Sequence, residues 1–506
     1  MLRVVIIKPS KYGLSGKVER FRWGFMPNST VPYIRSMTPK SFDGVPIETY
    51  AIDEYVQTDL RYLELLRNPQ KPTILALVGV QSHQFQRSLD LAAFARANGV
   101  RHCVIGGPHP MTCDTSMLQN RGISFAIAEA ELIWPQILRD AIDGELQPVY
   151  GSEQRWAEDL EAPVLIPPSK RDLRRYISPM LGIYPARGCP FTCNFCSVIK
   201  IAGRRIRSQS IETTMESLRK AKAAGVRLVM FTSDNFNKYS EAPELLEQMI
   251  AEKIQIPFFV QCDTQVGKQE EMVRLLARAG CFEMFVGVES FSRKTLLAAR
   301  KTQNHPELYA EIVRLCRHYR IKSHFSNILG FPEDTESNVR QHFRLLQEMR
   351  PTVASFYILT PIPGTEQYDQ FLTAGWISEQ NLDRFDGHNP TWKHPNLNAA
   401  QLESLLFYCY KAFYSARHTI TAAFDVLKPK AISTGPPAGF GLALFNRYCA
   451  DRRRHPMSGG VGQVQRDSVA DYMRLRKETF GVDLVPLPRS LVLSQREADL
   501  NFHMKL

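Results

Sequence analysis

Three cysteines fall close together in the stretch RGCPFTCNFCSV, namely Cys189, Cys193 and Cys196. Thiols this near one another in a reduced chain suggest a metal site. A structural zinc site takes four protein ligands, usually from two C-x2-C halves, and no second half occurs in this sequence. A [4Fe-4S] cluster takes one thiolate per iron, so three ligands leave one iron open to another molecule. The spacing therefore favours a cluster with an open iron over three unrelated thiols.

The composition is that of an ordinary globular chain. Its 506 residues are 44% hydrophobic and 23% charged, and this length predicts two or three domains. The start, MLRVVIIKPSKYG, lacks the long apolar core and cleavage site of a signal peptide, and no run of about 18 apolar residues occurs. We therefore expect a cytoplasmic protein whose ten cysteines stay reduced.

The net charge of +12 is a weak guide to partners. Half of it comes from residues 428–506, which hold 13 Lys or Arg against 7 Asp or Glu. A solvated basic face is the simpler interpretation, although a basic tail also suits peripheral contact with an anionic membrane surface. No nucleic-acid partner is expected.

The periodicity of the chain predicts two α/β domains as the scaffold for the cysteines. In residues 1–150, β-branched runs alternate with helical patterns, which predicts a parallel-sheet, Rossmann-like domain. Ligands of such sheets bind at the carboxyl ends of the strands, here GVQSHQ at 79–84 and GGPHP at 106–110. Neither loop is the G-x-G-x-x-G of dinucleotide-binding proteins. Residues 151–180, polar and proline-bearing, are predicted to form a linker.

A second α/β series occupies residues 181–366. The expected strands are 182–188, 227–234, 258–264, 284–290, 323–330 and 353–362. Six units are too few for a closed eightfold barrel, so we predict a partial (β/α)6 barrel of the TIM type, with the cysteine loop after its first strand. Residues 367–506 are predicted to form a mostly helical C-terminal extension, broken by STGPPAGFG at 433–441.

The C-x3-C-x-aromatic-C motif at the end of the first barrel strand resembles the signature of the radical SAM superfamily. The resemblance implies that the three cysteines bind a [4Fe-4S] cluster whose open iron binds S-adenosyl-L-methionine (SAM). It further implies reductive cleavage of SAM to a 5'-deoxyadenosyl radical. By position, the candidate SAM contacts are Phe195, Asp234, Asn235 and Glu289.

A Rossmann-like domain carrying GGPHP ahead of such a barrel resembles the cobalamin-binding subgroup of that superfamily. The resemblance covers roughly residues 1–420 and implies cobalamin between the two domains. The candidate corrinoid contacts lie in the two strand-end loops and are Ser82, His83, Gln84, Gly106, Gly107, Pro108 and His109. Relatives often carry G-E-G-E after the next strand, whereas this chain has AEAE at 128–131. Alanines there would hold the backbone further from a ligand.

This resemblance implies cobalamin-dependent methylation of an unactivated carbon in a biosynthetic pathway, because methylcobalamin can supply a methyl group to a carbon radical. Radical cyclisation, as in the anaerobic magnesium-protoporphyrin ester cyclase, is the alternative within the family. A methylthiotransferase would carry further N-terminal cysteines, and an electron carrier or other non-enzymatic protein would want a fourth ligand, so both are disfavoured. The expected partners are a small-molecule or lipid-like substrate and an electron donor such as flavodoxin or ferredoxin.

Overall fold

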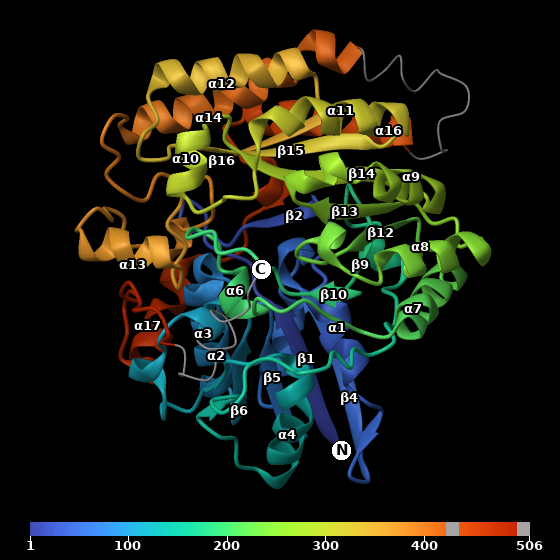
Figure 1. The fold of residues 1–506 in the computed structure, drawn as a ribbon. Coiled ribbons are helices and arrows are strands. Elements are labelled where there is room, and N and C mark those ends of the chain that lie inside the picture. Colours follow the sequence, from blue (N-terminus) through green and yellow to red (C-terminus); the bar gives the residue numbers. More distant parts are fainter. Residues whose placement is uncertain (421–434, 493–506) are drawn as a thin grey trace.

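The computed structural model describes residues 1–420 and 435–492 (Figure 1). Its N-terminal part is built on a seven-stranded sheet in the order β3-β4-β1-β5-β6-β7-β8, in which only β3 and β4 pair antiparallel. The strands are β1 (Leu2–Lys8), β3 (Ser41–Phe42), β4 (Val45–Asp53), β5 (Thr73–Leu77), β6 (His102–Gly106), β7 (Ser124–Ala126) and β8 (Val149–Tyr150). The parallel sheet expected within residues 1–150 is therefore present.

Helices cover both faces of this sheet, since its central strands are apolar on both sides. On one face, α1 (Thr30–Met37) and α4 (Ala130–Asp143) share a core with Ile6 of β1. On the other face, α2 (Phe85–Ala97) packs in a separate core with Ile7. This layered arrangement leaves only the strand ends free to meet a ligand.

A second sheet holds six parallel strands in the order β16-β15-β14-β13-β12-β9. They are β9 (Met180–Ile183), β12 (Leu228–Phe231), β13 (Phe258–Cys262), β14 (Cys281–Glu289), β15 (Lys322–Leu329) and β16 (Val353–Ile358). The helices between them are α7 (Ile211–Ala223), α8 (Ala242–Ala251), α9 (Glu270–Ala279), α10 (Arg293–Ala298), α11 (Tyr309–His318) and α12 (Glu336–Met349). Each expected barrel strand is present, and the strands lie in the sheet in the order of the chain. The domain boundaries at residues 150, 180 and 366 remain a prediction.

Segments from both ends of the chain border the gap between β9 and β16, the two edges of the partial barrel. β2 (Arg20–Gly24) pairs antiparallel with β17 (Gly460–Val464). The chain at 24–25 exchanges backbone hydrogen bonds with residues 175–178, just before β9. Beside β16, the Nε2 atom of His455 lies 2.8 Å from the carbonyl oxygen of Phe356. The sequence analysis did not predict this ribbon: RFRWG alternates arginine with an aromatic residue, but so short a run does not indicate a partner strand more than four hundred residues away.

The C-terminal region is mostly helical, with α13 (Glu366–Thr373), α14 (Ala399–Phe413), α16 (Gly435–Asp451) and α17 (Val469–Phe480). α14 packs against β16, and α17 lies beside α2 of the first sheet (Figure 1). α16 begins inside the segment expected to break the helix, since prolines are tolerated in a first helical turn. Residues 421–434 and the end of the basic tail at 493–506 lie outside the described residues. Across the described ranges, each helix is too short or too polar to span a bilayer.

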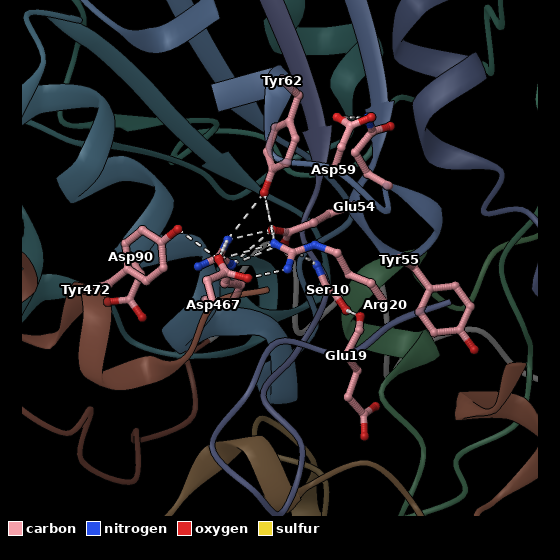
Figure 2. A network of polar contacts seen from close by, with 12 residues as sticks. Ser10, Glu19, Arg20, Glu54, Tyr55, Asp59, Tyr62, Asp90, Asp467 and Tyr472 are labelled. Atoms are coloured by element: carbon pink, nitrogen blue, oxygen red, sulfur yellow. Dashed lines mark hydrogen bonds and ion pairs between the residues drawn. The ribbon is translucent and has the colours of Figure 1, made fainter. Parts of the chain in front are cut away.

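A buried network of charged groups ties the C-terminal region to the first sheet (Figure 2). Glu54 accepts hydrogen bonds from Arg20 Nη2 at 2.7 Å and from Arg87 Nη2 at 2.6 Å, and all three side chains are fully buried. Asp467, which precedes α17, pairs with the same two arginines, and Tyr62 donates a hydrogen bond to Glu54. Burial alone would raise the pKa of Glu54, but the two arginines outweigh it and hold that pKa well below its usual value.

Candidate functional site

The three cysteines lie on one loop that follows the first barrel strand, after the short strand β10 (Ala186–Arg187). Cys193 is buried, whereas Cys189 and Cys196 are partly exposed. The backbone N–H of Cys196 donates to the carbonyl oxygen of Cys193 at 3.2 Å, which folds the loop back on itself. The structure therefore places the cysteine loop where the sequence predicted it, after the first barrel strand.

Polar side chains from neighbouring elements hold this loop. The backbone N–H of Gly188 donates to Asp234 Oδ2 at 2.8 Å, and Asp234 follows β12. Arg204 donates to the carbonyl oxygen of Pro190 at 2.9 and 3.2 Å. Gly188 has a φ of +105°, and a Cβ there would lie 2.2 Å from the carbonyl oxygen of Arg205. Only glycine therefore suits the residue just before Cys189.

The donor set fits an iron-sulfur cluster better than a single metal ion. Burial raises the pKa of Cys189 to about 11 and that of Cys196 to about 12, and the neighbouring thiols add to both shifts. The positive charge of bound iron would offset this repulsion and so favour the thiolate form. Within residues 1–420 and 435–492, no three His, Cys, Asp or Glu side chains converge on one point closely enough to hold one ion. A cluster does not need such convergence, because each thiolate binds a different iron.

Glu289 and Lys301 lie beside the cysteines at the mouth of the barrel. The Glu289 Oε1 atom is 2.5 Å from Lys301 Nζ, and that ammonium lies 5.8 Å from the centroid of the Phe195 ring. Burial disfavours the charged ammonium, yet Glu289 and the nearby Cys193 outweigh it, so the pKa of Lys301 lies above its usual value. Glu289 adopts a φ of +61° at an irregularity in the pairing of β14 with β15. Such strain in a non-glycine residue is typical of functional positions.

A side-chain amide also contacts the cysteine loop. Gln303 Nε2 lies 3.6 Å from Cys193 Sγ, within hydrogen-bonding range for sulfur. The other end of this amide, Gln303 Oε1, is buried without a hydrogen-bond partner. Buried polar atoms in native proteins are nearly always paired, so this oxygen marks a place for a bound group. Neither Gln303 nor Lys301 was predicted, because both follow α10 in a polar segment without a motif.

Asn235 is not available as a SAM contact in this structure, contrary to expectation. Its side chain makes two hydrogen bonds with Asp263 after β13, from Nδ2 to Oδ2 at 2.9 Å and from the Asp263 backbone N–H to Oδ1 at 3.0 Å. Asp234, the neighbouring candidate, turns the other way and lines the cavity described next. Burial raises the pKa of Asp234, partly offset by its hydrogen bond from Gly188.

A large, mostly apolar cavity lies where the carboxyl ends of β5, β6 and β7 face the barrel. Its volume is about 270 Å³, and it opens to solvent on one side. The first sheet contributes strand-end residues, including Gly79, Gly106, Gly107, Pro108 and Ala128. The barrel contributes Tyr184, Arg187, Thr232 and Asp234, and the short helix α6 (Val198–Ile201), directly after the cysteine loop, contributes Ile201 and its C-cap Ala202. The cavity is thus walled on one side by the helix that follows the cysteines.

Four of the seven predicted corrinoid contacts, Ser82, His83, Gln84 and His109, do not line this cavity. After β5 the chain enters a short 3-10 helix, Ser82–Gln84, and the side chains of these three residues do not face the cavity. His109 lies within 3.0 Å of Ser82 Oγ, stacks on Phe85, and has a pKa lowered by burial to about 3. Three residues remain as cavity-lining candidates, Gly106, Gly107 and Pro108.

Gly107 has a φ of +129°, and a Cβ there would lie 2.2 Å from the backbone nitrogen of Val80. We therefore expect Gly107→Ala to cost more than about 1 kcal/mol of stability, measured as a lower urea midpoint. The matched control is Gly144→Ala, where φ is +91° but no atom lies within 4 Å of the added methyl group. Equal losses of stability in Gly107→Ala and Gly144→Ala would show that the close contact with the backbone after β5 is not the reason for a glycine at position 107.

The AEAE segment plays a part that the sequence did not indicate. Ala128 lines the cavity, as expected for its position, but Glu129 and Glu131 point to two arginines beside the cysteine loop. Arg207 pairs with Glu129 at 2.6 Å, and Arg187 pairs with Glu131 at 2.9 Å. No local pattern could have predicted these ion pairs, because their partners lie more than fifty residues apart along the chain.

The comparisons with known proteins agree with this geometry. Residues 183–346 match the family model of the radical SAM superfamily. Together with the cysteine loop after the first barrel strand, this match shows that residues 183–346 form a radical SAM domain, and the cofactors of that superfamily are a [4Fe-4S] cluster and SAM.

Two curated relatives are bacteriochlorophyllide d methyltransferases of Chlorobaculum tepidum. The C-8(2)-methyltransferase is 24% identical over 406 residues, which are 76% of this chain and 87% of that protein. The C-12(1)-methyltransferase is 24% identical over 322 residues, 61% of this chain and 67% of that protein. Among solved structures, the radical SAM methyltransferase TsrM from Kitasatospora setae, with cobalamin and a [4Fe-4S] cluster bound, aligns with a TM-score of 0.57 at 16% identity, over 74% of this chain and 75% of that one. This last likeness is one of fold.

Proposed function

We propose that this enzyme is a cobalamin-dependent radical SAM methyltransferase that methylates an unactivated carbon of a small molecule. In the proposal, Cys189, Cys193 and Cys196 bind the cluster, and the cavity at the ends of β5, β6 and β7 binds cobalamin. When bound, the cluster and SAM supply a hydrogen-abstracting radical, and cobalamin supplies the methyl group.

The observation that carries the proposal is the shared wall of the two sites. Ile201 and Ala202, at the end of the short helix α6 that directly follows the cysteine loop, line the same cavity as Gly106, Gly107 and Pro108. Methyl transfer to a carbon radical needs the radical source and the methyl donor to lie close together. The connected cysteine loop and cavity wall would place them near each other. The glycines suit a large flat ligand because they let the backbone approach it closely.

The chain's own residues would orient the ligands and exclude water from them. Arg187 and Asp234 give the apolar cavity a small number of charged groups on its barrel side. Beside the cysteines, Gln303 Nε2 donates toward Cys193 Sγ, and the Lys301 ammonium offsets part of the rise that burial causes in the pKa of Cys189 and Cys196. A positive charge near these two sulfurs favours the thiolate form that binds iron.

The experiment is a product analysis on anaerobically reconstituted enzyme supplied with hydroxocobalamin, SAM and a reductant. Methylation predicts S-adenosylhomocysteine together with 5'-deoxyadenosine, because one SAM is consumed to regenerate methylcobalamin and another to form the radical. Failure to retain a corrinoid after desalting, judged from the visible spectrum, would contradict the proposal. Radical cyclisation, the second candidate, predicts 5'-deoxyadenosine alone.

The substrate class is part of the same proposal. We expect the substrate to be a small or lipid-like molecule that binds at the barrel mouth beside the cavity assigned to cobalamin, and an external electron donor such as flavodoxin or ferredoxin would reduce the cluster. The basic residues near the C-terminus would serve a peripheral membrane contact if the substrate is lipid-like. The described part of that region holds Arg452, Arg453 and Arg454, next to α16.

A further inference from the structure

We infer that Glu129 and Glu131 are positioning residues for the cluster-binding loop, holding it from the opposite domain through Arg207 and Arg187. The inference rests on the proposed binding of the cluster by Cys189. It assigns a task in the radical SAM site to two carboxylates at the start of α4, in the N-terminal part of the chain.

The first contact is a bidentate ion pair between buried groups. Arg207 donates from Nη1 to Glu129 Oε2 at 2.6 Å and from Nη2 to Glu129 Oε1 at 2.8 Å. The side chains are only 5% and 4% exposed. The same guanidinium donates to the carbonyl oxygens of Ala157 and Ala202, and Ala202 is the C-cap of α6, the short helix that follows the cysteine loop. Two parallel hydrogen bonds fix the direction of the guanidinium as well as its distance.

The second contact fixes the residue that leads into the first cysteine. Arg187 lies 2.9 Å from Glu131 and 3.4 Å from Glu129, and its guanidinium lies 5.0 Å from the centroids of both the Tyr33 and Tyr184 rings. Tyr33 also donates a hydrogen bond to Glu131. A guanidinium held by carboxylates and aromatic rings has little freedom to move.

The two arginines belong to a pair of short strands, β10 and β11 (Arg207–Ser208), whose connection at 188–206 contains the cluster loop. Arg187 and Arg207 face each other as partners in the antiparallel pairing of β10 with β11. Arg187 is followed directly by Gly188, whose N–H is held by Asp234, and then by Cys189. We therefore expect a shift of either arginine to move the sulfur of Cys189, because only Gly188 separates Arg187 from Cys189 and Arg207 is the strand partner of Arg187.

This arrangement also accounts for the alanines of AEAE. Glu129 and Glu131 follow the strand end that lines the cavity, and Ala128 before them and Ala130 between them line it as well. We expect the ion pairs of Glu129 and Glu131 with the arginines to form with either alanine or glycine between the two glutamates. Because Glu129, Glu131 and Arg187 line the cavity themselves, a ligand there would contact the same side chains that position the cysteine loop.

The test compares Glu129→Gln and Glu131→Gln with the wild-type enzyme after anaerobic cluster reconstitution. We expect both variants to keep their iron, since no ligand is removed. We expect an altered electron paramagnetic resonance spectrum of the reduced cluster when SAM is added, and SAM binding weakened by about 10-fold, as is typical when a partner of a metal ligand is lost. Glu145→Gln, an exposed acid beyond the end of α4, is the matched control and should behave as wild type.

A conservative variant separates positioning from mere folding. Arg207→Lys keeps the charge but loses the bidentate geometry, so it should give the same spectral change at an unchanged thermal melting temperature. Wild-type spectra and SAM affinity in Glu129→Gln, Glu131→Gln and Arg207→Lys would overturn the inference. A wild-type enzyme that binds no cluster would instead contradict the proposed function, before any variant is compared.

Discussion

Replacing Cys193 with alanine is expected to reduce the iron content of the reconstituted enzyme from about four per chain to near zero and to abolish cleavage of SAM. Cys193 is the buried member of the triplet, and Gln303 donates toward its sulfur. The remaining two thiolates would leave two irons without protein ligands. Iron analysis and chromatographic detection of 5'-deoxyadenosine measure the two effects.

A matched variant separates the loss of a ligand from the loss of any buried thiol. Cys316 on α11 is also buried, only 1% exposed, and its side chain packs in the core away from the cysteine loop. Cys316→Ala should therefore keep its iron and its SAM cleavage. Retention of a full cluster by Cys193→Ala would contradict the assignment of this cysteine as a ligand.

Replacing Glu54 with alanine is expected to destabilise the protein by about 3–5 kcal/mol, because it leaves two buried arginines without their shared partner. Arg20 and Arg87 are both fully buried, and Asp467 alone cannot balance two positive charges. The urea midpoint of unfolding, followed by far-ultraviolet circular dichroism, measures the loss. We expect the contacts between α17 and α2 to weaken first, since Asp467 precedes α17.

An exposed ion pair provides the comparison for this prediction. Glu64 pairs with Arg67 at 3.2 Å, and the two side chains are 68% and 51% exposed. Such pairs contribute about 0–1 kcal/mol, so Glu64→Ala should change the midpoint little. A loss in Glu54→Ala no larger than that in Glu64→Ala would mean that the buried network does not hold the C-terminal region in place.

Local patterns in the sequence predicted the strands and the strand-end glycines well. β5 and β14 are apolar runs, and such runs next to amphipathic helices identify parallel strands without any tertiary information. The cysteine spacing is equally local, and Gly106 and Gly107 could be placed at a cavity because they follow a buried strand. In each case the residues that matter lie within one element and the loop after it.

The direction of individual side chains could not be predicted in the same way. His83 was expected to face the cavity, but the turn after β5 directs it elsewhere, and no residue type in GVQSHQ indicates that turn. Glu129, Arg207 and Gln303 act through partners distant in the chain. The single sequence contains no signal for such pairs, since each residue alone reads as an ordinary polar surface position.

The β2–β17 ribbon has a consequence for how the chain is made. During synthesis from the N-terminus, β2 leaves the ribosome more than four hundred residues before β17, its partner in the ribbon. The barrel edge that these strands border therefore stays unfinished until nearly the whole polypeptide has emerged, even though its own six strands are already complete. In the cell, the cysteine loop would therefore lie in a barrel whose edge is still open for much of translation. Iron and sulfur would have this time to reach the loop before the β2–β17 ribbon forms.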